Sequence, residues 1–132
     1  MSGLPTEVGA ITLFVEDSVR SKEFYARVFG LEPVYEDENA VAFRFENLVV
    51  NLLRRPAAHE LVEPEAVAVA DSGASFQLTI GVEDADAVCA ELAARGVELL
   101  NGPQDRRWGL RTAAFADPDG HVWEVASNLA ET

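Results

Sequence analysis

The chain has 132 residues, of which 48% are apolar, and its 23 acidic and 10 basic side chains give a formal net charge of −13. A chain of this length can bury roughly two-thirds of its unfolded surface, so we expect one compact domain over residues 1–132. The negative charge argues against nucleic acid and anionic lipid surfaces as partners, because phosphate groups would repel the protein.

Two further features concern location and redox chemistry. No run of about 18 apolar residues could span a bilayer, and the opening residues lack the basic and then apolar order of a secretory signal. We therefore expect a cytoplasmic protein with no membrane partner. Cys89 is the only cysteine, so the sequence predicts neither an internal disulfide nor a thiolate cluster for zinc.

The first expected element is a strand over residues 10–15. Successive strand residues point to opposite sides of a sheet, so this strand has two distinct faces. The side expected to receive a helix carries Ile11, Leu13 and Val15, and the other side carries Ala10, Thr12 and Phe14.

An amphipathic helix is expected to begin near Ser18 and to end at Gly30, where glycine tolerates a left-handed backbone. Its apolar stripe consists of Phe24, Tyr25, Val28 and Phe29. Three short extended stretches follow, around 32–36, 40–46 and 48–54, with a tight hairpin turn at Glu46-Asn47. The first module therefore has the order βαβββ and covers about residues 9–54.

A second copy of this module follows a linker. Residues 55–74 hold two prolines and scattered charges, which predicts a linker with room for one helical turn. The triplet VED at 15–17 recurs at 82–84, again between an alternating stretch and an amphipathic one. The second module, about residues 75–128, is expected to contain a strand over 76–82, a helix from Ala85 to Gly96, and extended stretches over 97–100, 109–116 and 121–127.

Alternation in the second module again separates two faces. The apolar stripe of its helix consists of Val88, Cys89, Leu92 and Ala93. The strand side toward that helix carries Phe76, Leu78, Ile80 and Val82, and the opposite side carries Gln77, Thr79 and Gly81. The run Asp117-Pro118-Asp119-Gly120 has the chemistry of a type I turn between the last two strands.

A polar residue interrupts the last strand of each module, Asn51 in the first and Glu124 in the second. By alternation, we expect both to face the same open cleft as Thr12 and Thr79. Trp123 is the neighbour of Glu124 and is expected to point the other way, toward the helix.

The stretches ITLFVEDSVRSKEFYARVFGLEP (11–33) and WGLRTAAFADPDGHVWEVA (108–126), with the strand and helix over 76–96, resemble the vicinal oxygen chelate superfamily. That superfamily includes glyoxalase I, extradiol dioxygenases and bleomycin-resistance proteins. The resemblance implies an α+β fold of two tandem βαβββ modules, which form curled mixed sheets around a cleft with helices on the outer face. It also implies a homodimer with two equivalent clefts.

Enzymes of the superfamily hold a divalent metal with one residue from the first and one from the last strand of each module. The resemblance assigns these positions to Ala10, Asn51, Gln77 and Glu124. Alanine has no donor atom and asparagine offers only a neutral amide, so Gln77 and Glu124 remain as metal candidates in an incomplete ligand set. We expect no cofactor, although the alternative of a divalent metal stays open.

Neither histidine completes the metal set. His121 is three residues from Glu124 on one strand, so the two side chains are expected on opposite faces. His59 lies in the linker, where an exposed histidine without a role is the common case.

A carboxylate in a cleft needs compensation for its charge, and either Arg111 or a cationic ligand would supply it to Glu124. Trp108 is interpreted either as the aromatic wall of the cleft or as a cap on the edge of the core. The residues expected to bind ligand are Thr12, Asn51, Gln77, Thr79, Trp108, Arg111 and Glu124.

Three functional hypotheses follow. The first is a metal-free protein that binds or sequesters a cationic or aromatic small molecule, such as an antibiotic, in a dimer cleft. The second is a metal-dependent lyase or dioxygenase of the same superfamily, for which the ligand set is only half present. The third, a structural dimerisation module, would fill the cleft with large apolar side chains, which Thr12, Thr79 and Gly81 are not.

Overall fold

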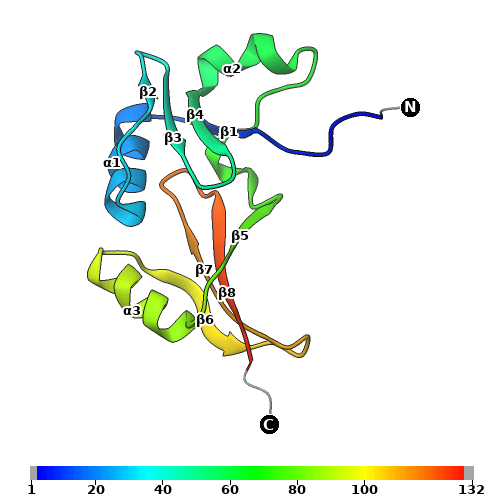
Figure 1. Cartoon of the computed structure of the whole chain (residues 1–132). Coiled ribbons are helices and arrows are strands. Elements are labelled where there is room, and N and C mark those ends of the chain that lie inside the picture. The colour runs from blue at the N-terminus through cyan, green and yellow to red at the C-terminus, as the bar shows by residue number, and fades with distance from the viewer. Residues whose placement is uncertain (1–2, 130–132) are drawn as a thin grey trace. The chain divides into compact units, whose positions relative to one another are not determined.

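The computed structural model describes residues 3–129 and divides between Ala68 and Val69 into two compact units. Figure 1 shows one helix-covered sheet in each unit. The first unit contains β1 (Ala10–Val15), α1 (Ser18–Phe29), β2 (Tyr35–Glu36), β3 (Ala40–Arg44), β4 (Val49–Arg54) and α2 (Arg55–Val62). The second contains the 3-10 turn η1 (Ala70–Ser72), β5 (Gln77–Gly81), α3 (Ala85–Ala94), β6 (Leu99–Asp105), β7 (Leu110–Ala116) and β8 (Val122–Asn128).

The two sheets share one topology, as the sequence repeat predicts. The strand order is β1-β4-β3-β2 in the first sheet and β5-β8-β7-β6 in the second. In each sheet the first strand pairs in parallel with the last, and the other neighbours pair antiparallel. The expected α+β fold of two tandem βαβββ modules is therefore confirmed.

Aspartate caps explain where the two module helices begin. The Asp17 carboxylate accepts hydrogen bonds from the backbone N–H groups of Val19 (2.9 Å) and Arg20 (3.3 Å). Asp84 accepts one from Ala87 at 3.1 Å, so both aspartates satisfy backbone donors that a helix leaves unpaired. Over residues 3–129, no helix combines the length and apolar character needed to cross a bilayer.

The core of the first unit lies between α1 and one face of its sheet. Leu13 and Val15 are buried while Thr12 is exposed, which confirms the alternation expected for the first strand. On the helix side, the ring of Tyr25 lies 6.1 Å from that of Phe43, and both side chains are fully buried. The opposite, polar side of the sheet is therefore free of α1.

The linker expected to have room for one helical turn forms the eight-residue helix α2, so that expectation was too low. Pro56 is tolerated in its first turn, where a missing N–H costs nothing. Ala58 of α2 packs into a buried cluster with Ala40 and Leu53, and Phe14, Ala57 and Val67 pack against this cluster. Helix α2 thus covers the polar side of the sheet at Phe14, whereas Thr12 on the same side stays exposed.

In the second unit, α3 covers the face that carries Trp123 and Val125, both of them buried. The expected helix stripe is partly wrong: Cys89 and Leu92 are buried, but Ala93 is exposed and Ala85 is buried instead. The buried stripe therefore begins one turn earlier than predicted.

Three strand boundaries also differ from expectation. The stretch 32–36 forms a strand only at Tyr35–Glu36, and Phe76 precedes β5 with 44% of its surface exposed. β6 is longer than the expected 97–100 and continues to Asp105. Its register against β7 shifts on both sides of Asn101, between Leu99 and Asn101 and again between Asn101 and Gln104, a pattern typical of a β-bulge.

Candidate functional site

The polar side of the first sheet brings Thr12 and Asn51 together. The two residues are register partners on the parallel strands β1 and β4, and the Asn51 amide Nδ2 lies 3.5 Å from the Thr12 hydroxyl. Ala10 lies one row away, opposite Val49. The row of Thr12 and Asn51 offers a hydroxyl and an amide, and the charged residue of the neighbouring row is Arg44, opposite Val49.

The polar side of the second sheet carries the charged group. Thr79 and Glu124 are register partners on β5 and β8, and the Thr79 hydroxyl donates to Glu124 Oε1 at 3.0 Å. Gln77 is exposed two residues earlier on β5 and shares this side. Glu124 is half-buried, and among the residues that the structure describes no cation contacts its carboxylate. Its charge is therefore available to a ligand.

The expected pairing of Arg111 with Glu124 is wrong. Ala114 lies opposite Glu124, whereas Arg111 lies opposite Ser127, so alternation places Arg111 on the α3 side of the sheet. Its guanidinium donates to Asp86 at 2.9 and 3.0 Å and to Asp105 at 2.8 Å. The hydrogen bond from Arg111 lowers the pKa of Asp86, and the same contact raises that of Arg111. Arg111 is thus occupied by two carboxylates.

Trp108 stands in the turn between β6 and β7 and exposes 59% of its surface. The interpretation of Trp108 as a cap on the core is therefore wrong. Two guanidinium groups flank its ring, with Cζ of Arg106 at 5.9 Å and Cζ of Arg107 at 5.6 Å from the ring centre. An exposed ring of this kind can stack on an aromatic or cationic ligand.

Arg106 is a site residue that the sequence reasoning missed. Its Nε donates to the Thr112 hydroxyl at 2.9 Å and its Nη2 donates to the Asn101 side-chain oxygen at 3.1 Å. Asn101 lies opposite Ala114, which lies opposite Glu124, so Arg106 is held on the same side of the sheet as the carboxylate. Arg106 and Arg107 are adjacent in the sequence DRRWG, and nothing in that sequence indicates which of the two lies on the side of Glu124.

The metal positions that the family resemblance implies do not fit a divalent ion. The chemistry of the donors decides this, because the Ala10 methyl group cannot ligate and the Asn51 amide is neutral. Thr79, rather than Gln77, is the register partner of Glu124. Within residues 3–129, no group of three or more His, Cys, Asp or Glu side chains is arranged to hold a metal ion.

His121 belongs to a turn rather than to the polar side. Its Nδ1 lies 2.9 Å from Oδ2 of Asp117, whose Oδ1 also accepts from the backbone N–H groups of Asp119 and His121. The Asp117 side chain has no exposed surface. These contacts fix the turn that joins β7 to β8 and so set the register that presents Glu124.

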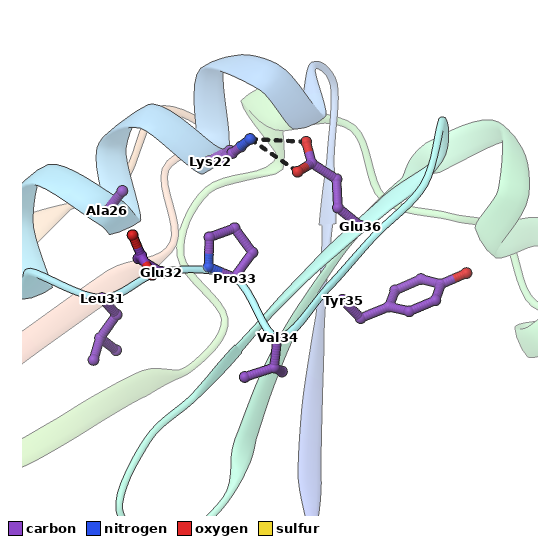
Figure 2. Close-up of a pocket in the computed structure, with 8 residues that line it drawn as sticks. All are labelled: Lys22, Ala26, Leu31, Glu32, Pro33, Val34, Tyr35 and Glu36. Atoms are coloured by element: carbon purple, nitrogen blue, oxygen red, sulfur yellow. Dashed lines mark hydrogen bonds and ion pairs between the residues drawn. The ribbon is translucent and has the colours of Figure 1, made fainter.

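The first unit also contains an open hollow of about 560 Å³ between α1 and the segment that leads into β2. Its walls are Lys22, Ala26, Leu31, Glu32, Pro33, Val34, Tyr35 and Glu36. Figure 2 shows Lys22 bridging to Glu36, with Nζ to carboxylate distances of 2.8 and 3.0 Å. The hollow was not expected, because the sequence predicted a strand over the stretch that forms its wall.

Comparison with known proteins supports the fold and the repeat. The family model of the Glyoxalase/Bleomycin resistance protein/Dioxygenase superfamily matches residues 7–125. The chain is 35% identical over 124 residues to the uncharacterized protein YraH of Bacillus subtilis (strain 168), which covers 90% of this chain and 96% of YraH.

Solved structures agree in architecture. A glyoxalase/bleomycin resistance protein/dioxygenase from Nocardioides has a TM-score of 0.87 at 24% identity, over 100% of this chain and 89% of that one. A glyoxalase-related enzyme from Fulvimarina pelagi has a TM-score of 0.79 at 26% identity, over 94% and 89% of the two chains. From the family match and the identity to YraH, we conclude that this chain belongs to the glyoxalase/bleomycin resistance protein/dioxygenase superfamily.

Proposed function

We propose that this protein binds a small molecule with a cationic or aromatic group, without a metal, and sequesters it. Antibiotics are one such class of molecule, and the name of the superfamily includes bleomycin resistance. The single observation that carries the proposal is Glu124, a half-buried carboxylate that accepts a hydrogen bond from the neutral Thr79 hydroxyl at 3.0 Å. A carboxylate in that setting favours a cation from the ligand.

Two other observations support a binding role. Arg111 is removed from the site by its contacts with Asp86 and Asp105, so it cannot neutralise Glu124. The register neighbours of Glu124 are Thr79, which offers a hydroxyl, and Ala114, which offers only a methyl group, so neither supplies a positive charge to the carboxylate. The donor set lacks the hard, charged ligands that a catalytic divalent ion requires.

The substitution Glu124→Gln tests the proposal because it keeps the shape of the side chain and removes its charge. We expect it to weaken binding of 4-phenylbenzylamine (called phenylbenzylamine below), an aromatic monocation, by about tenfold to hundredfold, since a charge-assisted contact contributes about 1.5–3 kcal/mol. Isothermal titration calorimetry measures the affinity. Metal analysis of the purified protein should find well below one ion per chain in the wild type and in the variant.

Glu98→Gln is the matched control, since Glu98 is an exposed residue of the same unit and the change in charge is identical. We expect wild-type affinity from it. Stoichiometric zinc, nickel, iron or manganese in the wild type, lost in Glu124→Gln, would contradict the proposal and favour a metal-dependent lyase or dioxygenase. Equal affinity of the wild type and Glu124→Gln for the probe would also contradict it.

We also propose that the protein acts as a homodimer. Each four-stranded sheet ends in edge strands, β1 and β2 in the first unit and β5 and β6 in the second, and unpaired edges favour association. Multi-angle light scattering at micromolar concentration should therefore give twice the mass of the chain. A mass equal to one chain at that concentration would refute the dimer.

A further inference from the structure

The polar side of the second sheet carries two opposite charges that do not contact each other. Glu124 stands at the β5 and β8 end of a cross-strand row that continues through Ala114 to Asn101. Arg106 is anchored on Asn101, at the far end of that row. Neighbouring strands are about 4.8 Å apart, so the backbones of Glu124 and Asn101 are about 10 Å apart.

The guanidinium of Arg106 is held in place by two hydrogen bonds, which occupy only some of its N–H donors. Arginine has five N–H donors, and the contacts to Thr112 and Asn101 occupy one on Nε and one on Nη2. Both acceptors are neutral, and the described part of the chain supplies no carboxylate to Arg106. The end formed by Nη1 and Nη2 therefore keeps parallel donors that match the two oxygens of a carboxylate.

Arg111 shows what the same side chain does when its role is structural. It makes ion pairs with Asp86 and Asp105. Acidic residues outnumber basic ones by 23 to 10, so carboxylate partners are plentiful in this chain. Arg106 is instead oriented by a buried hydroxyl and an amide, which fix the guanidinium without neutralising it.

We propose that Arg106 binds an anionic oxygen of the ligand, so that the site takes an amphoteric molecule with a cationic group on Glu124 and a carboxylate on Arg106. Ala114 lies between the two charges in the cross-strand row and is 3% exposed, so it adds a methyl group and no charge to the strip that joins them. The ring of Trp108 beside Arg106 offers a stacking surface for an aromatic body. This inference rests on the proposed function and narrows its ligand class.

Three probes that share a biphenyl frame test the contacts with Glu124 and with Arg106 separately. The amphoteric probe is a biphenyl with an aminomethyl group at one end and a carboxylate at the other; phenylbenzylamine keeps only the cation, and biphenyl carboxylate only the anion. We expect Arg106→Met to weaken binding of the amphoteric and anionic probes by about tenfold to hundredfold. Its affinity for phenylbenzylamine should equal that of the wild type.

Arg107→Met is the matched control, because Arg107 is the adjacent arginine and its guanidinium lies 5.6 Å from the centre of the same Trp108 ring. We expect wild-type affinity for the amphoteric probe from it. Arg106→Lys keeps the charge without the planar fork and should recover part of the affinity lost in Arg106→Met, which also guards against a folding defect in the latter. Circular dichroism of each variant checks the fold.

The outcomes distinguish this inference from the proposed function. Suppose that Glu124→Gln loses affinity for phenylbenzylamine, while Arg106→Met keeps wild-type affinity for the amphoteric probe. The inference is then overturned and the proposed function stands. Equal losses in Arg106→Met and Arg107→Met overturn it too, since a general charge effect would then explain both. If the wild type binds none of the three probes, both proposals are overturned.

Discussion

Gly102→Ala should lower the free energy of unfolding by about 2–5 kcal/mol, the sum of a left-handed backbone cost and an overpacking cost. Gly102 has φ of +84°, and a Cβ built there would lie 2.3 Å from the Thr112 carbonyl oxygen and 2.8 Å from the Ala113 Cα. These are backbone atoms of β7, which cannot move without breaking the β6–β7 ladder. Urea denaturation followed by tryptophan fluorescence measures the change, because Trp108 and Trp123 both lie in this unit.

Gly96→Ala separates the two contributions to that cost. Gly96 has φ of +81°, yet nothing lies within 4 Å of a Cβ built there. We expect a loss of only about 1–2 kcal/mol, the cost of a left-handed backbone alone. Equal losses in the two variants would refute the steric role of the close approach between β6 and β7.

Phe43→Ala should destabilise the first unit by about 3–5 kcal/mol, the usual cost of removing a fully buried aromatic side chain. Phe43 has no exposed surface, and its ring lies 6.1 Å from that of Tyr25 on α1. The substitution leaves a cavity between the helix and the sheet that neither can close without moving. Far-UV circular dichroism during urea denaturation gives the free energy of unfolding.

Phe76→Ala removes the same atoms from a different setting and serves as the control. Phe76 is 44% exposed and precedes β5, so we expect a loss below about 1 kcal/mol. A loss as large as that of Phe43→Ala would mean that Phe76 belongs to the core, as simple strand alternation suggested.

Alternation and repetition in the sequence were enough to predict the architecture. The period of two in residues 10–15 and 77–81 identified which sides of the strands are buried, because a strand with one buried face must alternate. The two copies of VED located the helix starts, since Asp17 and Asp84 are both N-caps. Alternation and helix caps depend on residues that are close together in the chain, so they can be recognised from the sequence alone.

The position of Arg111 was also determined by the sequence, although the first interpretation missed it. The turn at Asp117–Gly120 places Ala116 opposite Val122, and each further step along β7 and β8 keeps the pairing in register. Counting along the two strands brings Arg111 opposite Ser127, on the α3 side. Charge complementarity alone would pair Arg111 with Glu124, but the strand register decides which side chains share a face.

Only the tertiary structure decided the length of α2 and the place of Arg106. Helix α2 is stabilised by packing of Ala58 against Leu53 and against Ala40, which is 18 residues earlier in the chain, so the linker by itself showed no matching local pattern. Arg106 reaches Thr112 and Asn101 where the register of β6 shifts on both sides of Asn101, and a bulge of that kind depends on how two backbones meet. The sequence by itself therefore determined the modules, their caps and the side of the sheet that carries Glu124. The contacts that orient the guanidinium of Arg106 on that side depend on how β6 and β7 pack against each other. No single stretch of sequence contains that information.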